Sequence, residues 1–199
     1  MTEKNRPFGE VFDAHTAAEF QTRDVEATMA TMGANPHVTH VPVMTGGHGT
    51  DAVRNFYDTW FIGHWPDDAK ITLVSRTVGE SQLVDELILS FTHDCEMPAI
   101  LPDIKPTGRK VVVPTVVIVG FDQNSNITHE HIYWDQASML VQLGLLDKRA
   151  ARNRRRAGGA AARSQASLQY ADPEIAEARM EGLGVLLVVV AVFVANLPA

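Results

Sequence analysis

Apolar residues recur along this chain at two spacings, one typical of helices and one typical of strands. Helical spacing predicts a helix that ends near Gly33 and a second that begins at Asp51, where Thr50 can cap it. Their buried faces would be formed by Phe12, Ala17, Phe20, Val25 and Met29 in the first, and by Val53, Phe56, Tyr57 and Trp60 in the second. Residues 37–45 are extended in pattern, and three glycines then predict a loop: Gly46, Gly47 and Gly49.

The spacing typical of strands dominates the following residues. Three β-rich runs occupy residues 71–79, 83–93 and 110–121, and a polar turn joins the last of them to an alternating segment, residues 127–134. An apolar, helix-like run follows Asp135. Helices first and antiparallel strands afterwards predict an α+β fold, with helices covering one face of a sheet.

The alternating segment 127–134 is rich in ionisable side chains. One face of such a strand would hold His129, His131 and Tyr133, and the other would hold Glu130, Ile132 and Trp134. A strand wholly inside a core would not carry this many ionisable groups, because each needs a buried partner. We therefore expect one face to line a cavity or an assembly surface, with Asp135 at its rim.

Composition limits the class of protein. The chain has 199 residues, 45% of them hydrophobic and 21% charged, which is typical of one globular domain with an extension. Residues 1–147 have a net charge of −11 and residues 148–199 a net charge of +4. An acidic body argues against a nucleic-acid partner. The single cysteine, Cys95, excludes an intrachain disulfide, and the N-terminus lacks an apolar signal segment, so we expect a cytoplasmic protein.

The amino-acid composition of the chain changes after Asp147. We expect residues 1–147 to form the domain, residues 148–169 to be a basic linker rich in Ala, Arg and Gly, and residues 170–199 to be a polar stretch followed by a valine-rich apolar tail. The apolar run at 183–197 is shorter than the roughly 18–20 residues that span a bilayer. A packing element is therefore the favoured interpretation, and membrane contact by the tail is the alternative.

Four segments of the domain resemble one known family. Residues 37–49 (HVTHVPVMTGGHG), 75–79 (SRTVG), 84–94 (VDELILSFTHD) and 129–147 (HEHIYWDQASMLVQLGLLD) look like the SnoaL-like branch of the NTF2-like superfamily. The resemblance covers nearly all of residues 8–147. It implies a cone-shaped α+β fold in which helices close a strongly curved mixed sheet around an apolar pocket. Relatives include polyketide cyclases, ketosteroid isomerases, epoxide hydrolases and dehydratases, so the fold does not settle the function.

The resemblance also suggests a catalytic residue. In polyketide cyclases of this branch an aspartate near the start of the final helix is the general base, and Asp135 is the position that matches best. An aspartate there could instead only cap the helix that begins at Gln136. From local chemistry, His131 or His129 would be the acid or polariser that accompanies the base.

Other residues are assigned to the pocket from their chemistry. We expect a small apolar ligand to contact Trp134, Tyr133, Trp60, Phe56, His40 and Glu86. His129 and His131 have the spacing at which two imidazoles could share a metal ion, with a third ligand from His93 or His40. No third ligand is marked by spacing, so neither a metal nor a cofactor is expected.

One ion pair can be predicted from neighbouring strands. Asp85 and Glu86 are adjacent inside a strand, so one of them must face inward and needs a partner. Arg76 is the candidate, as half of a structural ion pair.

These observations favour a cofactor-independent lyase or isomerase, similar to polyketide cyclases. It would act by proton transfer on an apolar carbonyl or polyketide-like substrate, and we expect a homodimer. The competing hypothesis is a non-catalytic module that binds a small ligand or dimerises. The two hypotheses differ in whether a carboxylate and an imidazole converge in one cavity.

Overall fold

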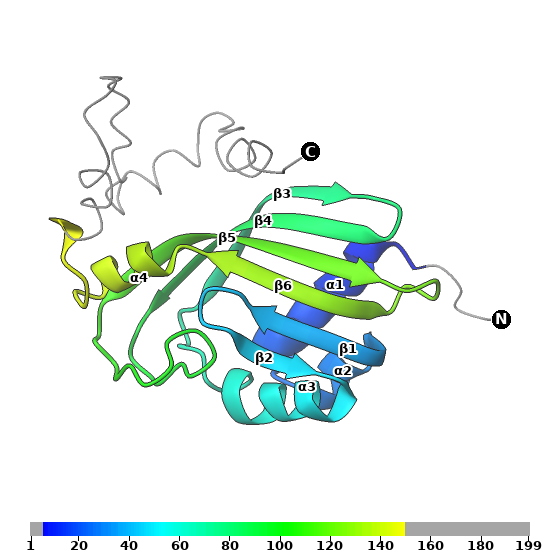
Figure 1. Ribbon diagram of the computed structural model, residues 1–199, viewed down its shortest axis with the longest axis horizontal. Helices are drawn as coiled ribbons and strands as arrows, with labels where there is room; N and C mark the ends of the chain where they lie inside the picture. The colour runs from blue at the N-terminus through cyan, green and yellow to red at the C-terminus, as the bar shows by residue number, and fades with distance from the viewer. Residues whose placement is uncertain (1–5, 150–199) are drawn as a thin grey trace, which may run out of the picture. The chain divides into compact units, whose positions relative to one another are not determined.

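The computed structural model describes residues 6–149 of the chain (Figure 1). The predicted linker and tail, residues 148–169 and 170–199, lie outside the described residues except for positions 148 and 149. The helices are α1 (Phe8–Ala17), α2 (Val25–Met29), α3 (Thr50–Phe56) and α4 (Gln136–Gln142), with π-helical turns η1 (Ala18–Thr22) and η2 (Tyr57–Phe61). The strands are β1 (Met32–His40), β2 (Thr45–His48), β3 (Lys70–Val78), β4 (Gln82–Thr92), β5 (Lys110–Phe121) and β6 (Ile127–Trp134).

The six strands form one mixed sheet in the order β2-β1-β6-β5-β4-β3. Strands β3, β4, β5 and β6 are an antiparallel meander, as the sequence predicts. Strand β1 pairs with β6 in parallel, with His37 opposite His129 and His40 opposite Ile132. This pairing brings the beginning of the chain beside its last strand. The predicted α+β class is confirmed.

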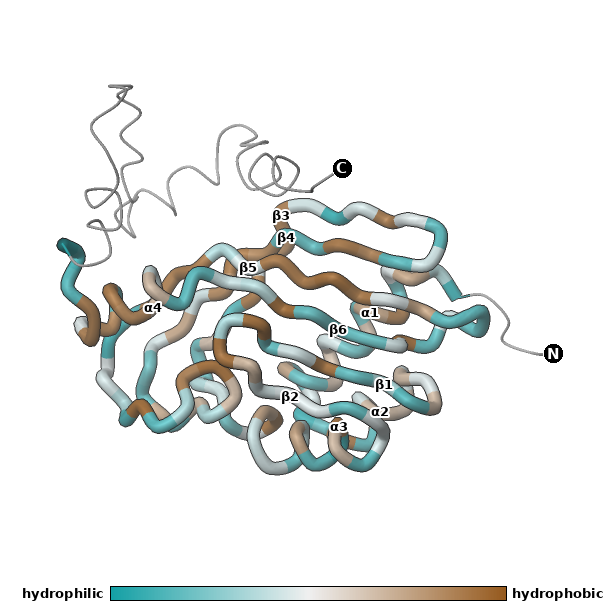
Figure 2. Tube along the Cα trace, in the orientation of Figure 1, coloured by the Kyte–Doolittle hydropathy of each residue, from teal (hydrophilic) through white to brown (hydrophobic). Residues whose placement is uncertain are grey.

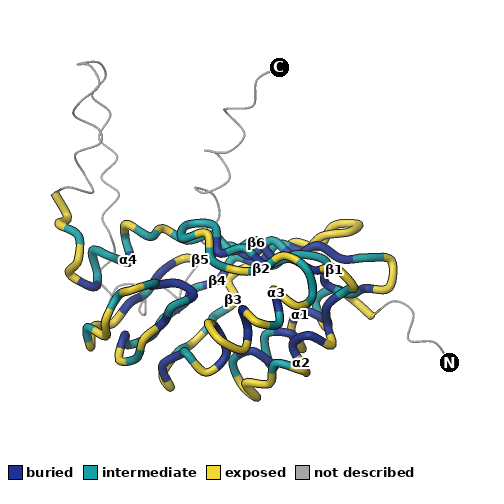
Figure 3. Tube along the Cα trace, turned by 60° about the horizontal axis from the view of Figure 1, so that its bottom comes forward, coloured by how far each residue is buried: buried dark blue, intermediate teal, exposed yellow. Residues whose placement is uncertain are grey.

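The core lies between the sheet and helices α1, α2 and α3, which cover one of its faces (Figures 1 and 3). Strand β4 shows why: Leu83, Leu87, Leu89 and Phe91 alternate with partly exposed residues and are buried beneath the helices. Strands β4 and β5 are the most apolar part of the sheet (Figure 2). Helix α4 packs at one end, against β5.

The predicted ion pair forms on this buried face. Asp85 is 1% exposed, and the Arg76 guanidinium donates to both of its carboxylate oxygens, each at 2.7 Å. Glu86 points the other way and accepts a hydrogen bond from Ser75. Asp85 is therefore the inward-facing acid.

Two local predictions are wrong. The first helix is interrupted at Arg23, which has a left-handed φ of 53°, and a new helix begins after Asp24, whose side chain accepts a hydrogen bond from Ala27 N at 3.0 Å. The expected glycine loop is largely strand β2, which contains Gly46 and Gly47. A Cβ at Gly46 would overlap the Val38 carbonyl group, so glycine permits the close approach of β2 to β1.

Within residues 6–149, no helix combines the length and the apolar character needed to cross a membrane.

Candidate functional site

Strand β6 presents one of its faces to a cavity between the sheet and the helices. Glu130, Ile132 and Trp134 line that cavity, and His129 and His131 occupy the alternate positions on the outer face. The cavity measures about 70 Å³. Its wall is mostly apolar and aromatic, with Phe12, Phe20, Phe61, Trp65, Leu87 and Met139 among the lining residues. Four ionisable side chains interrupt this wall: Glu19, His40, Tyr57 and Glu130.

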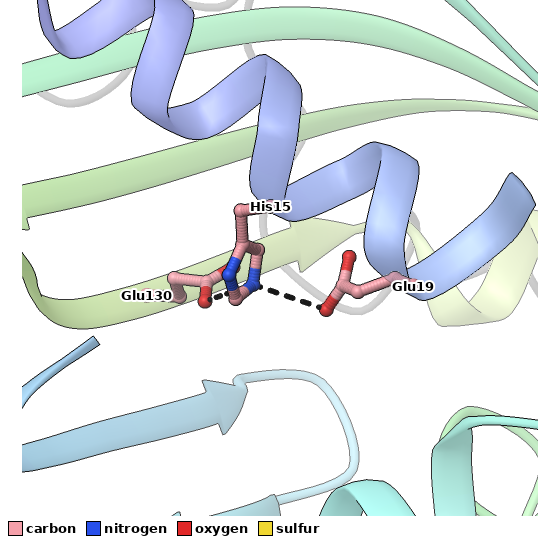
Figure 4. Close-up of side chains that lie close together, drawn as sticks. All are labelled: His15, Glu19 and Glu130. Atoms are coloured by element: carbon pink, nitrogen blue, oxygen red, sulfur yellow. Dashed lines mark ion pairs between the residues drawn. The ribbon is translucent and has the colours of Figure 1, made fainter. Parts of the chain in front are cut away.

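A buried imidazole joins two carboxylates at the wall of the cavity (Figure 4). His15 Nε2 lies 2.9 Å from an oxygen of Glu130 and 3.3 Å from an oxygen of Glu19. The Tyr57 hydroxyl donates to the same Glu130 oxygen at 3.1 Å. All four residues are at most 5% exposed. Helix α1, its π-helical continuation η1, turn η2 and strand β6 therefore each contribute one residue.

The spacing along α1 and η1 explains how two of these residues meet. His15 and Glu19 are four residues apart, so both point from the same side of the helix toward β6. Glu130 reaches them from β6, because the alternation of that strand turns it inward. We call His15, Glu19, Tyr57 and Glu130 the buried tetrad.

A hydrogen bond on the other side of the ring fixes where the protons of His15 lie. His15 Nδ1 is 2.6 Å from the Thr31 hydroxyl oxygen, and that hydroxyl donates its own hydrogen to the Thr28 carbonyl oxygen at 2.7 Å. Thr31 can therefore only accept from His15, so Nδ1 carries a hydrogen. Nε2 faces carboxylate oxygens, which are acceptors, so it also carries a proton in this arrangement. His15 is an imidazolium.

The electrostatics agree with this assignment. Burial alone would lower the pKa of His15, but the carboxylates of Glu130 and Glu19 outweigh it and raise that pKa to about 10. Burial also opposes ionisation of Glu130, yet His15 and the Tyr57 hydroxyl bring its pKa below the ordinary value. In contrast, burial raises the pKa of Glu19, and His15 offsets this only in part. Glu130 is therefore the ionised partner, and Glu19 is the carboxyl whose pKa moves toward neutrality.

His40 is a second, chemically different histidine at the cavity. Burial lowers its pKa to about 4, so the ring is neutral at physiological pH. Thr45 donates its hydroxyl hydrogen to the Ala99 carbonyl oxygen at 2.5 Å and lies 3.3 Å from His40 Nδ1. Nδ1 therefore carries the hydrogen, and Nε2 is left as an acceptor.

The buried tetrad also contains a set of ligand atoms of the kind that binds metals. One atom each from His15, Glu19 and Glu130 lies within 4.8 Å of the other two. A nitrogen and two carboxylate oxygens suit zinc or another divalent transition ion. The N–H group at His15 Nε2 already bridges the two carboxylates. A metal ion at this place would have to displace its proton.

The structure places Asp135 at the start of α4, outside the residues that line the cavity. Asp135 is exposed, and one of its oxygens accepts hydrogen bonds from Ala137 N at 2.9 Å and Ser138 N at 3.2 Å, as the N-cap of α4. It lies in the chain between Trp134 and Met139, which both line the cavity. The capping interpretation matches this geometry. Among the described residues no hydrogen bond reaches the other carboxylate oxygen, so the role of Asp135 as the general base stays a prediction.

The other predicted site residues divide between the two faces of the sheet and the core. Trp134 and His40 line the cavity. His129, His131 and Tyr133 lie on the outer face of β6, because the face of that strand with Glu130 is the one turned inward. Three further predicted site residues lie outside the cavity. Glu86 is on the outer face of β4, Trp60 is 42% exposed, and Phe56 lies in the core beside His40.

The residues that sequence reasoning missed had a visible signal. His15 and Glu19 stand four positions apart within an otherwise amphipathic helical segment, a spacing that places both on one face. The sequence predicts Tyr57 as a buried residue, without its hydrogen-bonding role. It places Glu130 on the same face of residues 127–134 as Trp134, without a role in the site. What the pattern lacked was the tertiary contact that joins these positions.

Among known proteins, similarity is found only to solved structures, and it concerns the fold. No family model matches the chain, and no match is found among curated proteins. Among solved structures, a hypothetical protein from Catenulispora acidiphila with a ketosteroid isomerase-like fold, in complex with trimethylamine, has a TM-score of 0.54 at 16% identity. The match covers 71% of this chain and 95% of that one. A protein from Shewanella denitrificans assigned provisionally as a SnoaL-like polyketide cyclase has a TM-score of 0.55 at 15% identity, over 70% and 98% of the two chains.

The chain has the NTF2-like fold. The resemblance noted from the sequence is thus confirmed at the level of the fold. The Δ5-3-ketosteroid isomerase of a Mycobacterium species is also similar, with a TM-score of 0.50 at 22% identity over 68% of this chain and 98% of that one. An NTF2-like protein of unknown function from Burkholderia pseudomallei matches equally broadly, with a TM-score of 0.54 at 15% identity over 70% and 98% of the two chains. At sequence identities this low, structural similarity supports a shared fold but does not identify the reaction.

Proposed function

We propose that this protein is a cofactor-independent enzyme that moves a proton on a small apolar carbonyl compound, in an isomerase or lyase type of reaction. The observation that supports it is that Glu19 and Glu130 line an otherwise apolar cavity and that the buried His15 imidazole joins their carboxylates. A purely ligand-binding cavity has no need of two buried carboxylates, each of which is costly to desolvate.

Glu19 is the proton-transfer group in this proposal. It lines the cavity, and burial raises its pKa, which suits an acid–base group working near neutral pH. Its carboxylate would take a proton from the carbon next to the substrate carbonyl and return that proton either to another carbon or to a leaving hydroxide. The first outcome is an isomerisation and the second a dehydration.

The other members of the buried tetrad orient Glu19 and influence its ionisation. The His15 imidazolium, 3.3 Å from a Glu19 oxygen, favours the carboxylate form and offsets negative charge that develops on the substrate. Glu130, which accepts from both His15 and Tyr57, keeps His15 protonated and correctly oriented. Glu130 and Tyr57 are therefore positioning residues in this proposal.

The size of the cavity narrows the substrate class. Its volume of about 70 Å³ is well below the roughly 300–1,000 Å³ typical of sites for drug-sized ligands. Among apolar carbonyl compounds, this size favours a single ring or a short chain over a multi-ring polyketide. Aromatic side chains such as Phe20, Phe61 and Trp134 would contact its apolar part.

Proton exchange offers a test that needs no knowledge of the natural substrate. Small cyclic ketones and β,γ-unsaturated ketones, incubated with the full chain in D₂O, should exchange α-hydrogens faster than in buffer, as followed by NMR. Glu19→Gln should lower this rate by about 10²-fold or more. Glu10→Gln is the matched control, because Glu10 is an exposed carboxylate on the same helix. Equal rates for these two variants would remove Glu19 from the mechanism.

The competing function is a module that binds a small ligand without reaction. The trimethylamine complex of the Catenulispora acidiphila protein shows that one protein of this fold accommodates a small organic molecule. If ketones in the panel bind to this chain, seen as chemical-shift changes at Trp134, and none exchanges hydrogen, the binding module is favoured. A homodimer, expected from the sequence, is compatible with either function.

A further inference from the structure

Four of the eight histidines gather on the outer face of the sheet, away from the cavity. His48 on β2, His37 on β1 and His129 on β6 form one row, because His37 is the register partner of both of the others. His131 lies two positions further along β6, on the same face as His129. We call these four residues the outer histidine cluster. The proposed proton-transfer function uses none of them.

Two of the rings already point their nitrogens at each other. His37 Nε2 lies 3.0 Å from His131 Nε2. Zinc holds imidazole nitrogens at about 2.0–2.1 Å in a tetrahedral geometry, which places two of them roughly 3.3 Å apart. The observed separation is thus close to that of two nitrogens sharing one ion.

A third ligand is available on either side of this pair. The rings of His129 and His37 have centroids 5.1 Å apart, and those of His129 and His131 are 4.9 Å apart. His48 stacks on His37 with centroids 5.4 Å apart, and its side chain is exposed and so can rotate. In the structure as it stands only two nitrogens converge, so the third joins through a side-chain rotation.

The strands beneath the cluster make room for it. Gly120 on β5 is the register partner of His129, and a Cβ at that position would overlap the His129 ring. The absence of a side chain there lets the imidazole lie flat against the neighbouring strand. Glycine inside a strand otherwise weakens it, so its presence in β5 suits a need for close approach.

The chemistry of the cluster favours a metal over other ligands. Within residues 6–149 no carboxylate forms an ion pair with any of the four histidines. The atoms that converge there are imidazole nitrogens, with His37 Nε2 facing His131 Nε2. Neutral imidazole is the form that binds zinc, copper and nickel.

We propose that the outer histidine cluster is a binding site for one divalent transition-metal ion of the zinc class, held by His37, His131 and a third imidazole from His129 or His48. The third ligand is neither His40 nor His93, because His40 faces the cavity and His93 is buried elsewhere. An open fourth position would hold water.

Calorimetric titration of the full, chelator-treated chain with ZnCl₂ tests the proposal. We expect one Zn²⁺ per chain, and His37→Ala and His131→Ala should each weaken binding at least tenfold. His64→Ala is the matched control, because His64 is a partly exposed histidine outside the cluster. Comparing His129→Ala with His48→Ala identifies the third ligand. Binding of Co²⁺ with the strong visible absorption of a tetrahedral site would support the same geometry.

Three outcomes would overturn the proposal. The first is no saturable Zn²⁺ binding in the micromolar range or tighter. The second is binding that survives His37→Ala and His131→Ala but is lost in Glu130→Gln, since the ion would then belong to the buried tetrad. The third is half an ion per chain with metal-dependent doubling of the mass, which would mean a bridge between two copies. None of these depends on the ketone exchange, so failure of one proposal leaves the other standing.

Discussion

His15 Nε2 lies 2.9 Å from a carboxylate oxygen of Glu130, and neither residue is more than 4% exposed. This contact ties the first helix to the last strand across the core. Because the same imidazole donates to Thr31 through Nδ1, both of its N–H groups are satisfied inside the protein. A buried ion pair of this kind is stabilising only while every hydrogen-bonding atom keeps a partner.

Thr31→Val is the first test of that requirement. Valine has nearly the same shape as threonine but cannot accept the Nδ1 hydrogen, so His15 is left with an unsatisfied donor. We expect a loss of about 1–3 kcal/mol in the free energy of unfolding and a lower His15 pKa by NMR titration. Thr39→Val, at an outer-face position of β1, is the control and should be near neutral. A His15 pKa unchanged by Thr31→Val would contradict the assigned hydrogen bond from His15 Nδ1 to the Thr31 hydroxyl.

The sequence alone predicts some of these relationships because they are local. The alternation of residues 127–134 separates Glu130 from His129 and His131 correctly, and Asp135 stands where a helix cap is expected. Arg76 and Asp85 are found because adjacent strands of a meander pair in register. Each inference needs only a period or a neighbouring strand.

Which face of β6 lines the cavity is not a local property. It depends on the helices α1–α3, which cover the face carrying Glu130, and on the parallel pairing of β6 with β1, which the order of elements did not indicate. The pattern of β6 favours its histidine face as the catalytic one, because imidazoles are the commoner catalytic groups. A single histidine on an apolar helix face, such as His15, is ordinary in a sequence, so its role follows only from its tertiary partners.

The Arg76–Asp85 pair supports a prediction about stability. Arg76→Met leaves a carboxylate that is 1% exposed without its bidentate partner, which should cost about 3–5 kcal/mol. The double variant with Asp85→Leu should recover much of that loss, because no charge remains buried. Urea denaturation measures both. Arg54→Met, which removes the partner of the exposed Glu26, should cost at most about 1 kcal/mol. Equal losses for the Arg76 and Arg54 variants would show that burial does not matter here.

Asp135 allows its two interpretations to be separated by one pair of variants. Since it caps α4, Asp135→Ala should cost about 1 kcal/mol, and Asp135→Asn should cost much less because asparagine caps nearly as well. Both should keep the ketone exchange activity. A folded Asp135→Asn protein without any exchange activity would restore Asp135 as the base and remove Glu19 from that role.

The domain boundary expected after residue 147 remains a prediction that truncation can test. Residues 6–149 contain the whole sheet, its core and the cavity, so a chain ending at residue 147 should fold with a melting temperature close to that of the full chain. Its mass in solution should correspond to the expected homodimer. Failure of the shortened chain to fold would place part of residues 148–199 in the core, and a monomeric mass would contradict the dimer.

The raised pKa of His15 predicts how stability depends on pH. The folded-state value of about 10 exceeds the unfolded value of about 6.5, so the imidazolium contributes fully below pH 6.5, and its contribution is lost as the pH rises toward 10. We expect the melting temperature to fall across this window. Glu130→Gln removes the main carboxylate that raises the His15 pKa, so the variant should be less stable at pH 6.5 and lose less between pH 6.5 and 10. Glu86→Gln, at a carboxylate on the outer face, should keep the wild-type profile. Parallel alkaline losses in the wild type and Glu130→Gln would mean that Glu130 does not hold the His15 proton.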